Sequence, residues 1–158
     1  MTTPSASHAS FVIERVFDAT PAQVFAAFAD PVAKARWFGA PPDQWQPTLR
    51  EHDFCVGGRE RLIGIWANGT VSDFDCRYFD ILPGQRIVYS YAMQIDGRRI
   101  SVSLSTVELS AEGRGTRMRY TEQGAYLDGY DAAGSRERGT RALFDALQAS
   151  LQPTQPHR

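Results

Sequence analysis

The chain has little that would suggest a metal centre or a redox site. It contains only 2 cysteines and 3 histidines among 158 residues, and Cys55 and Cys76 form no CxxC pair. His8, His52 and His157 are far apart, so we predict no metal ligands, no cofactor and no histidine-assisted nucleophile. Both cysteines are expected to be small apolar core residues rather than a disulfide.

The chain also has no excess of charge of one sign and no long apolar run. The 17 basic and 18 acidic residues are intermixed and give a formal net charge of −1, which does not suit a nucleic-acid partner. No run of about 18 apolar residues and no signal peptide are present, so we expect no membrane insertion and a cytoplasmic location. Val56-Gly57-Gly58-Arg59 lacks the lysine of a phosphate-binding loop.

What remains is the composition of one soluble globular domain. Hydrophobic residues make up 42% and charged residues 22% of the chain, which are ordinary values for such a domain. A chain of this length can bury about 68–70% of its unfolded surface, so it can fold without disulfides or metals. We expect a single domain over 1–158, with its core at about 11–151 and frayed tails at 1–9 and 153–158.

Alternating apolar residues and turn signals predict seven β-strands. The first is Phe11–Phe17, and the others are expected at 49–55, 59–66, 70–81, 86–93, 99–110 and 116–123. Asn68-Gly69 and Asp96-Gly97 are typical hairpin turns between them. Near Tyr78 the apolar phase shifts, which suggests a β-bulge. Six strands joined by short turns form an antiparallel meander, and a twisted sheet of that size curls.

Three helices are predicted, two short ones after the first strand and a long one at the end. Thr20-Pro21-Ala22-Gln23 forms a capping box, and Asp30-Pro31 repeats the cap for a second helix to Phe38. From Asp131 to Leu151 the apolar residues gather on one side of an amphipathic helix of about five turns. Its apolar side needs a broad partner, and the curved sheet is the natural one. The fold class is therefore α+β.

Five short stretches, in order, resemble the START-like (SRPBCC) superfamily with its helix-grip fold. They are the capped helix at 18–28, Trp37-Phe38-Gly39-Ala40-Pro41, Asp53 with Val56-Gly57-Gly58, Asp80 to Val88, and Gly115-Thr116-Arg117-Met118. The resemblance covers about 11–151 and points to bacterial single-domain proteins related to the activator of Hsp90 ATPase. It implies about seven curved antiparallel strands wrapped around the C-terminal helix. It also implies a cavity between sheet and helix for a lipid, sterol, polyketide or other apolar molecule.

The sequence offers a lining for such a cavity. Aromatic and flexible side chains are expected to line it, namely Trp37, Phe38, Trp66, Tyr89, Tyr91, Met93, Met118, Tyr120 and Leu143. Buried tyrosines need hydrogen-bond partners and methionine tolerates irregular space, which favours a partly open pocket over a filled core. Ser101, Ser103 or Ser105 could add orienting hydroxyls, depending on the strand register.

Two residues of the last helix add to the predicted ligand site. Arg136 shares the helix side of Gly139 and Leu143, so its cation is expected at the pocket mouth, where it could hold an anionic head. The alternative is that Arg136 reaches water or pairs with Asp128 or Asp131. Gly139 costs about 1 kcal/mol relative to alanine inside a helix, which suggests that a strand or ligand approaches closely there. Many relatives have tryptophan after this glycine, whereas this chain has threonine.

The main functional hypothesis is an intracellular protein that binds an apolar small molecule and is not an enzyme. The second is a polyketide-cyclase-like or hydrolytic enzyme in which Glu122, or Asp75 with Arg77, acts as a general base in the cavity; Glu60 is a further candidate. For these carboxylates the alternative is a solvated strand end. The third is a module that docks on an Hsp90-type chaperone, and it ranks last because we expect no docking domain like that of the eukaryotic co-chaperones. Exposed strand edges leave a homodimer open.

Overall fold

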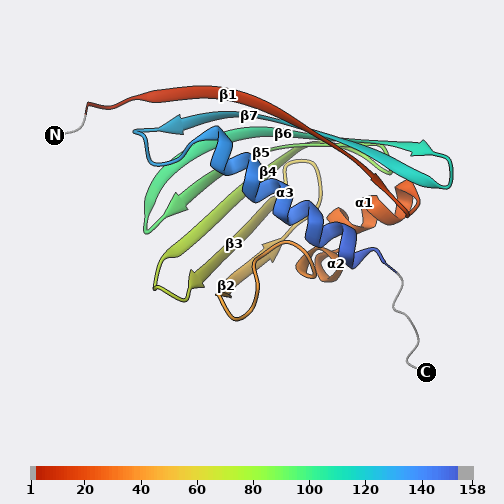
Figure 1. The fold of residues 1–158 in the computed structure, drawn as a ribbon, viewed down its shortest axis with the longest axis horizontal. Helices are drawn as coiled ribbons and strands as arrows, with labels where there is room; N and C mark the ends of the chain where they lie inside the picture. The colour runs from red at the N-terminus through yellow and green to blue at the C-terminus, as the bar shows by residue number, and fades with distance from the viewer. Residues whose placement is uncertain (1–2, 153–158) are drawn as a thin grey trace.

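A computed structural model describes residues 3–152 as seven strands and three helices (Figure 1). The strands are β1 Ala6–Phe17, β2 Trp45–His52, β3 Arg59–Trp66, β4 Val71–Leu82, β5 Arg86–Ile95, β6 Arg98–Glu112 and β7 Gly115–Leu127. The helices are α1 Pro21–Ala29, α2 Pro31–Ala35 and α3 Ala133–Ser150. The predicted tail at 1–9 is wrong from Ala6 onward, because β1 begins there; the tail at 153–158 lies outside the described residues.

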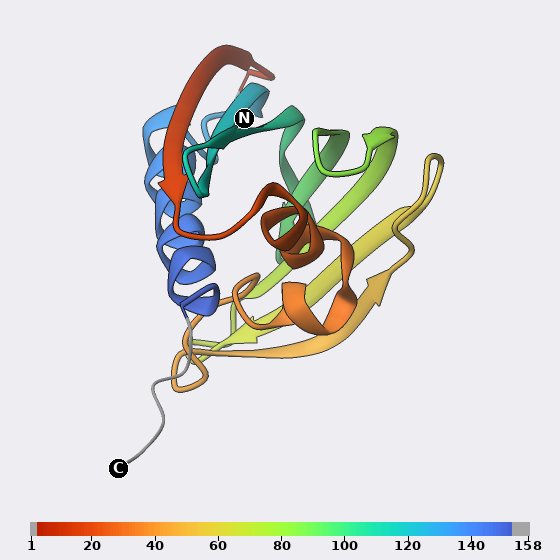
Figure 2. The same ribbon diagram turned by 90° about the vertical axis from the view of Figure 1, so that its right-hand side faces the viewer.

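All seven strands form one antiparallel sheet in the order β1-β7-β6-β5-β4-β3-β2. From β2 to β7 each strand pairs with the next in the chain, which confirms the predicted meander. β1 joins the far edge by pairing with β7, from Ala6 opposite Leu127 to Phe17 opposite Thr116. The predicted bulge is present, since the register of β4 on β5 shifts just after Tyr78. Figure 2 shows the resulting curvature of the sheet around the interior.

The helices close the concave side of this sheet. α3 lies along it, and α1 and α2 cover one end (Figures 1 and 2). The capping box that begins α1 is present, with Thr20 and Gln23 exchanging hydrogen bonds of 3.2 and 2.8 Å. Phe144 and Leu147 of α3 are 3% and 0% exposed, because they pack into the core. The fold is the α+β helix-grip fold that the sequence predicts. None of the helices within 3–152 is both long and apolar enough to span a membrane.

β1, β5, β6 and β7 are longer than the sequence pattern predicts, and β2 is displaced toward the N-terminus. β2 begins at Trp45 rather than 49 and contains Pro47, with a register shift on β3 between Pro47 and Leu49. An edge strand tolerates proline there because one side of its backbone needs no partner. β7 runs to Leu127 instead of ending at 123, since the early residues of β1, from Ala6, pair with it.

Two other local predictions are partly wrong. α2 ends at Ala35 and not at Phe38, and single turns connect it to the following loop. Cys76 is buried in β4 as expected, whereas Cys55 is exposed, because β2 already ends at His52 and Cys55 falls in the turn before β3. Both cysteines are free thiols.

Candidate ligand-binding site

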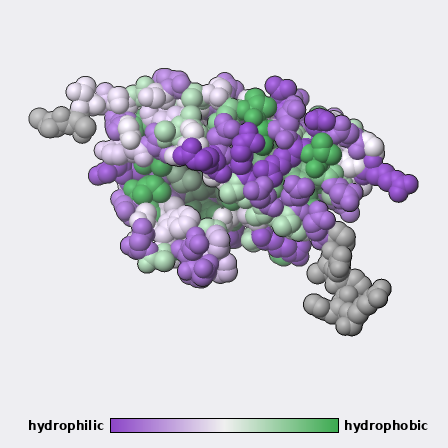
Figure 3. Space-filling view, in the orientation of Figure 1, coloured by the Kyte–Doolittle hydropathy of each residue, from purple (hydrophilic) through white to green (hydrophobic). Residues whose placement is uncertain are grey.

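A cavity of about 380 Å³ lies between α3, the region around α2 and the concave face of the sheet. Most of its wall is apolar and aromatic, and most of its charged and small polar members lie in the first half of α3 or just before it. Figure 3 shows a recess with an apolar floor and a polar rim beside the first turns of α3. Cavities of about 300–1,000 Å³ with this kind of wall are typical of small-molecule sites.

The structure brings ten of the eleven predicted ligand residues to this wall. They are Trp37, Phe38, Trp66, Tyr89, Tyr91, Met93, Tyr120, Arg136, Gly139 and Leu143. Met118 is the exception, because it is 0% exposed and packs in the core without forming part of the wall. That these residues bind a ligand stays a prediction. The sequence analysis missed Trp45 and Phe74, which also line the cavity.

The aromatic wall is held in place by its own contacts. The ring centroids of Phe38 and Phe74 are 4.9 Å apart, and those of Phe74 and Tyr91 are also 4.9 Å apart. The indole of Trp37 donates a hydrogen bond of 2.9 Å to the carbonyl oxygen of Ala27. Such contacts between rings from the sheet and from the helical segment keep the cavity open in a defined shape, so its wall is largely pre-formed.

Gly139 is an exposed residue of the cavity wall with open space beside it. A β-carbon placed on this residue would have no other heavy atom within 4 Å, and Gly139 lines the cavity. The expectation that a strand packs closely against Gly139 is therefore wrong. The space beside it is open, which leaves the approach of a ligand as the remaining prediction.

Arg136 is held by groups of the protein itself. Its side chain is 9% exposed, and Nη1 donates to the hydroxyl of Tyr91 at 2.8 Å. Nη2 donates to Ser101 Oγ at 2.6 Å and to Asp131 Oδ2 at 2.8 Å, and Nη1 lies 3.7 Å from Glu122 Oε2. Burial alone would lower the pKa of Arg136, but the neighbouring phenol and the two carboxylates outweigh it and raise that pKa. The guanidinium is charged and paired, and Asp131 is the partner that the sequence offered as an alternative.

Glu122 lies behind the tyrosines rather than on the cavity wall. It is 0% exposed, and its Oε1 accepts hydrogen bonds from Tyr91 at 2.9 Å and Tyr120 at 2.6 Å. Its Oε2 has no hydrogen-bond partner among the described residues. Burial, followed by the charge of Glu122, raises the pKa of Tyr91, so that phenol stays protonated and donates. Glu122 is therefore no solvated strand end, and two phenols separate it from any guest.

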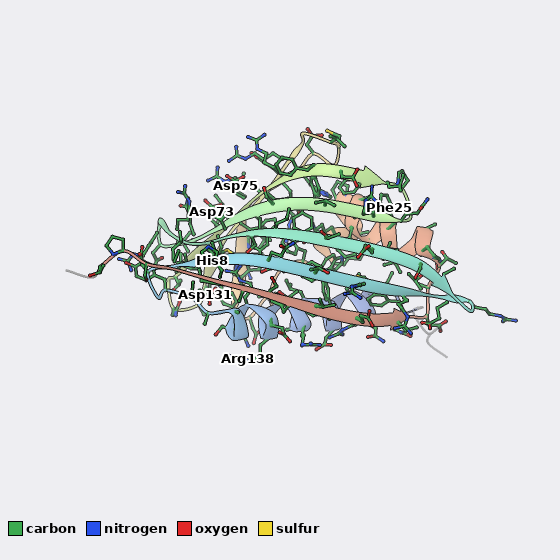
Figure 4. The ribbon with its side chains drawn as sticks, turned by 90° about the horizontal axis from the view of Figure 1, so that it is seen from above. His8, Phe25, Asp73, Asp75, Asp131 and Arg138 are labelled. Atoms are coloured by element: carbon green, nitrogen blue, oxygen red, sulfur yellow. The ribbon has the colours of Figure 1, made fainter. Side chains whose placement is uncertain are left out.

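Asp75 lies on the opposite face of the sheet from the cavity. It forms two hydrogen bonds of 2.8 Å with Arg59, not with Arg77. Arg59 reaches Asp75 diagonally from β3, where Arg61 is the residue directly opposite Asp75. Figure 4 shows Asp73 and Asp75 projecting outward from the sheet. The hydrogen bond from Arg59 lowers the pKa of Asp75, although burial opposes it. Asp75 thus cannot serve as a base inside the cavity.

A second buried polar cluster was largely missed by the sequence analysis. Lys34 Nζ donates to Glu60 Oε1 at 2.5 Å, and the hydroxyl of Tyr78 donates to the same oxygen. His52 Nε2 lies 3.3 Å from that hydroxyl and 3.6 Å from the carboxylate. Burial lowers the pKa of His52 against the opposing charge of Glu60, so its ring is neutral near pH 7. One signal could have pointed here, since Lys34 is the only lysine in the sequence.

Comparison with known proteins gives a family and several similar structures. The family model described as activator of Hsp90 ATPase homolog 1-like protein matches residues 18–152. The Mll3558 protein from Rhizobium loti is 44% identical with a TM-score of 0.86, over 93% of this chain and 99% of that one. A protein from Rhizobium leguminosarum is 43% identical with a TM-score of 0.90, over 95% and 98%. An AHSA1-like protein from Aeromonas hydrophila shares the fold at 22% identity and a TM-score of 0.70, over 95% and 99%. No curated protein matches the chain.

Proposed function

This chain belongs to the activator of Hsp90 ATPase homolog 1-like family, and we propose that it binds an uncharged, largely apolar small molecule between α3 and the sheet. The supporting observation is the cavity of about 380 Å³ with its aromatic wall. Burial of apolar ligand surface, at roughly 25 cal/mol per Å², is the main source of affinity in such a site.

The charges around the cavity favour a neutral guest over an anionic one. Arg136 faces two carboxylates, Asp131 and Glu122. One cation therefore faces two carboxyl groups. Lys34 is likewise paired with Glu60. Neither cation has charge to spare for a ligand, so we do not assign Arg136 the anion-holding role that the sequence suggested.

Of the three serines that were expected to orient the ligand, Ser101 and Ser105 are already engaged within the protein. Ser103 Oγ has no hydrogen-bond partner among the described residues, but Ser103 is not part of the cavity wall. Ser101 accepts from Arg136 at 2.6 Å, and Ser105 shares a hydrogen bond of 2.8 Å with Tyr120. A guest that offered many polar groups would leave them unpaired inside the cavity, which costs free energy. Selection among guests therefore rests mainly on fit to the aromatic wall.

A matched pair of aromatic ligands tests this proposal. The protein is titrated calorimetrically with 2-naphthalenemethanol, which is neutral, and with 2-naphthoate, which carries a carboxylate on the same ring system. We expect the alcohol to bind with a negative heat-capacity change and the carboxylate to bind at least about tenfold more weakly. If neither the alcohol nor the neutral dye Nile red binds, the proposal fails.

The Asp131→Asn variant tests the charge argument separately. It removes one of the two carboxylates that face Arg136, so we expect affinity for 2-naphthoate to rise while affinity for the alcohol stays unchanged. Glu137→Gln is the matched control, because Glu137 lies on α3 and pairs with the exposed Arg141. An equal gain in both variants would show that only overall charge matters.

A further inference from the structure

The one lysine of the chain lies in the wall of the cavity. Lys34 stands among 17 basic residues, and the other sixteen are arginines. The second basic residue of the wall, Arg136, is also part of a buried ion pair. Arginine suits buried pairs because its planar group forms several directed hydrogen bonds, whereas lysine provides a compact amine that can act as a nucleophile. Because every other basic residue is an arginine, the single lysine suggests that a primary amine is needed at this position.

Lys34 is placed where a guest could reach it. Its side chain is 8% exposed, and its Nζ lies 4.6 Å from the ring centroid of Phe38, which also lines the cavity. Lys34 comes from α2, whereas Arg136 comes from the first turn of α3, at the end of that helix that lies away from α2 (Figure 1). The two basic groups are thus separate features of the cavity.

The neighbours of the amine are the groups that carbonyl chemistry requires. Glu60 Oε1 lies 2.5 Å from Lys34 Nζ and can accept its proton, and the hydroxyl of Tyr78 lies 3.4 Å from the same nitrogen. His52 lies 3.3 Å from that hydroxyl. A carboxylate that takes a proton from an amine and then gives it to an oxygen acts first as a general base and then as a general acid. Buried lysines with such partners form imines with carbonyl compounds.

We propose that Lys34 captures an apolar aldehyde as an imine inside the cavity, an inference that rests on the binding function proposed above. The ammonium gives a proton to Glu60, and the free amine attacks the carbonyl carbon. A C–N bond forms while the electron pair of the C=O bond moves to oxygen, which takes the proton back from Glu60. The carbinolamine then loses its hydroxyl, with one further proton, as water. Ammonium and aldehyde thereby become iminium and water, with no oxidant or reductant.

Reductive trapping tests this proposal on the full chain. The protein is incubated with 2-naphthaldehyde and sodium cyanoborohydride, digested, and mapped by mass spectrometry. The chain has only two kinds of primary amine, the α-amino group and Lys34, so the position of the naphthylmethyl group is unambiguous. We expect one adduct, on Lys34, and we expect excess 2-naphthalenemethanol to prevent it by occupying the cavity.

Three results would overturn the proposal. They are labelling of the α-amino group alone, absence of any adduct, and labelling of Lys34 that excess 2-naphthalenemethanol does not reduce. The Lys34→Arg variant keeps a cation beside Glu60 but offers no imine-forming amine, so it is expected to lose the adduct, and its circular dichroism spectrum checks that it is folded. Binding of the alcohol to the wild-type protein is measured independently. An absence of adduct together with binding of the alcohol would therefore overturn the imine proposal and leave the proposed binding function standing.

Discussion

At the scale of single residues, the cost of removing Arg136 separates a buried ion network from a surface charge. Arg136→Gln leaves Asp131 and Glu122 without their cation, and breaking a buried pair in this way costs about 3–5 kcal/mol. We expect the free energy of unfolding, measured with urea, to fall by that amount.

The matched control for Arg136 is its neighbour Arg138. Figure 4 shows Arg138 projecting from α3 away from the sheet, and its side-chain hydrogen bond goes to the exposed Ser135. Arg138→Gln should change stability by no more than about 0.5 kcal/mol. Equal costs for the two variants would contradict the account of Arg136 as the centre of a buried network.

A pH dependence of stability follows from His52. Burial holds the pKa of His52 below the value of about 6.5 that it has in the unfolded chain. As the pH falls through about 6.5, the unfolded chain takes up a proton that the folded chain does not, so folding becomes less favourable. We expect the free energy of unfolding to decrease from about pH 7.5 to about pH 5.5, and His52→Gln to flatten that slope.

His8 provides the comparison for this pH dependence. It lies on the exposed early part of β1, so His8→Gln should leave the slope in place. Stability that is constant or rises as the pH falls in the wild-type protein would rule out a buried neutral His52.

The contrast between Arg136 and Lys34 also shows what a sequence can predict at this scale. Helical periodicity alone places Arg136 on the side of Gly139 and Leu143, and the structure finds all three on the cavity wall. The environment of Lys34 depends on Glu60, which is 26 residues away, and on Tyr78, which is 44 residues away. No local pattern encodes such neighbours, because they depend on the register of β3 and β4 against the helical segment.

At the scale of elements, two glycines should respond oppositely to the same substitution. Gly139→Ala adds a methyl group to open space in α3, so we expect about 0.5–1 kcal/mol of stabilisation from helix propensity and reduced unfolded-state entropy. In Gly64→Ala, the β-carbon would meet the indole of Trp45 at 2.0 Å, and crowding of this kind costs about 1–3 kcal/mol. Urea unfolding of both variants checks the pair. A destabilised Gly139→Ala variant would mean that the space is not open.

Most elements could be predicted because their signals are local. A capping box, hairpin turns and an alternating pattern each act within a few residues, and α1, β3 and the β4 bulge are found where they predict them. The errors occur where a partner decides the length. β7 reaches Leu127 because β1 extends back to Ala6, and this pairing joins residues more than 100 positions apart.

At the scale of the whole molecule, the order of elements was enough to predict the architecture. A meander must curl, and a long amphipathic helix after it can bury its apolar side only against the concave face. The size of the space between them was not predictable, because it depends on how Phe38 packs against Trp37 and Phe74 and on how Trp45 packs against Gly64. Those contacts leave a cavity where a tighter arrangement would have left a filled core.

A cavity of this kind links ligand occupancy to the stability of the entire fold. A guest that binds only the folded state stabilises it by about 2.7 kcal/mol at a concentration of one hundred times Kd. For a chain of 158 residues, that corresponds to a rise in Tm of about 5–11 °C. We expect 2-naphthalenemethanol to raise the Tm of the wild-type protein by this amount. In Gly139→Leu the rise should be largely lost, because the new side chain extends into the space that the guest would fill. A rise of equal size in this variant would place the guest elsewhere on the protein.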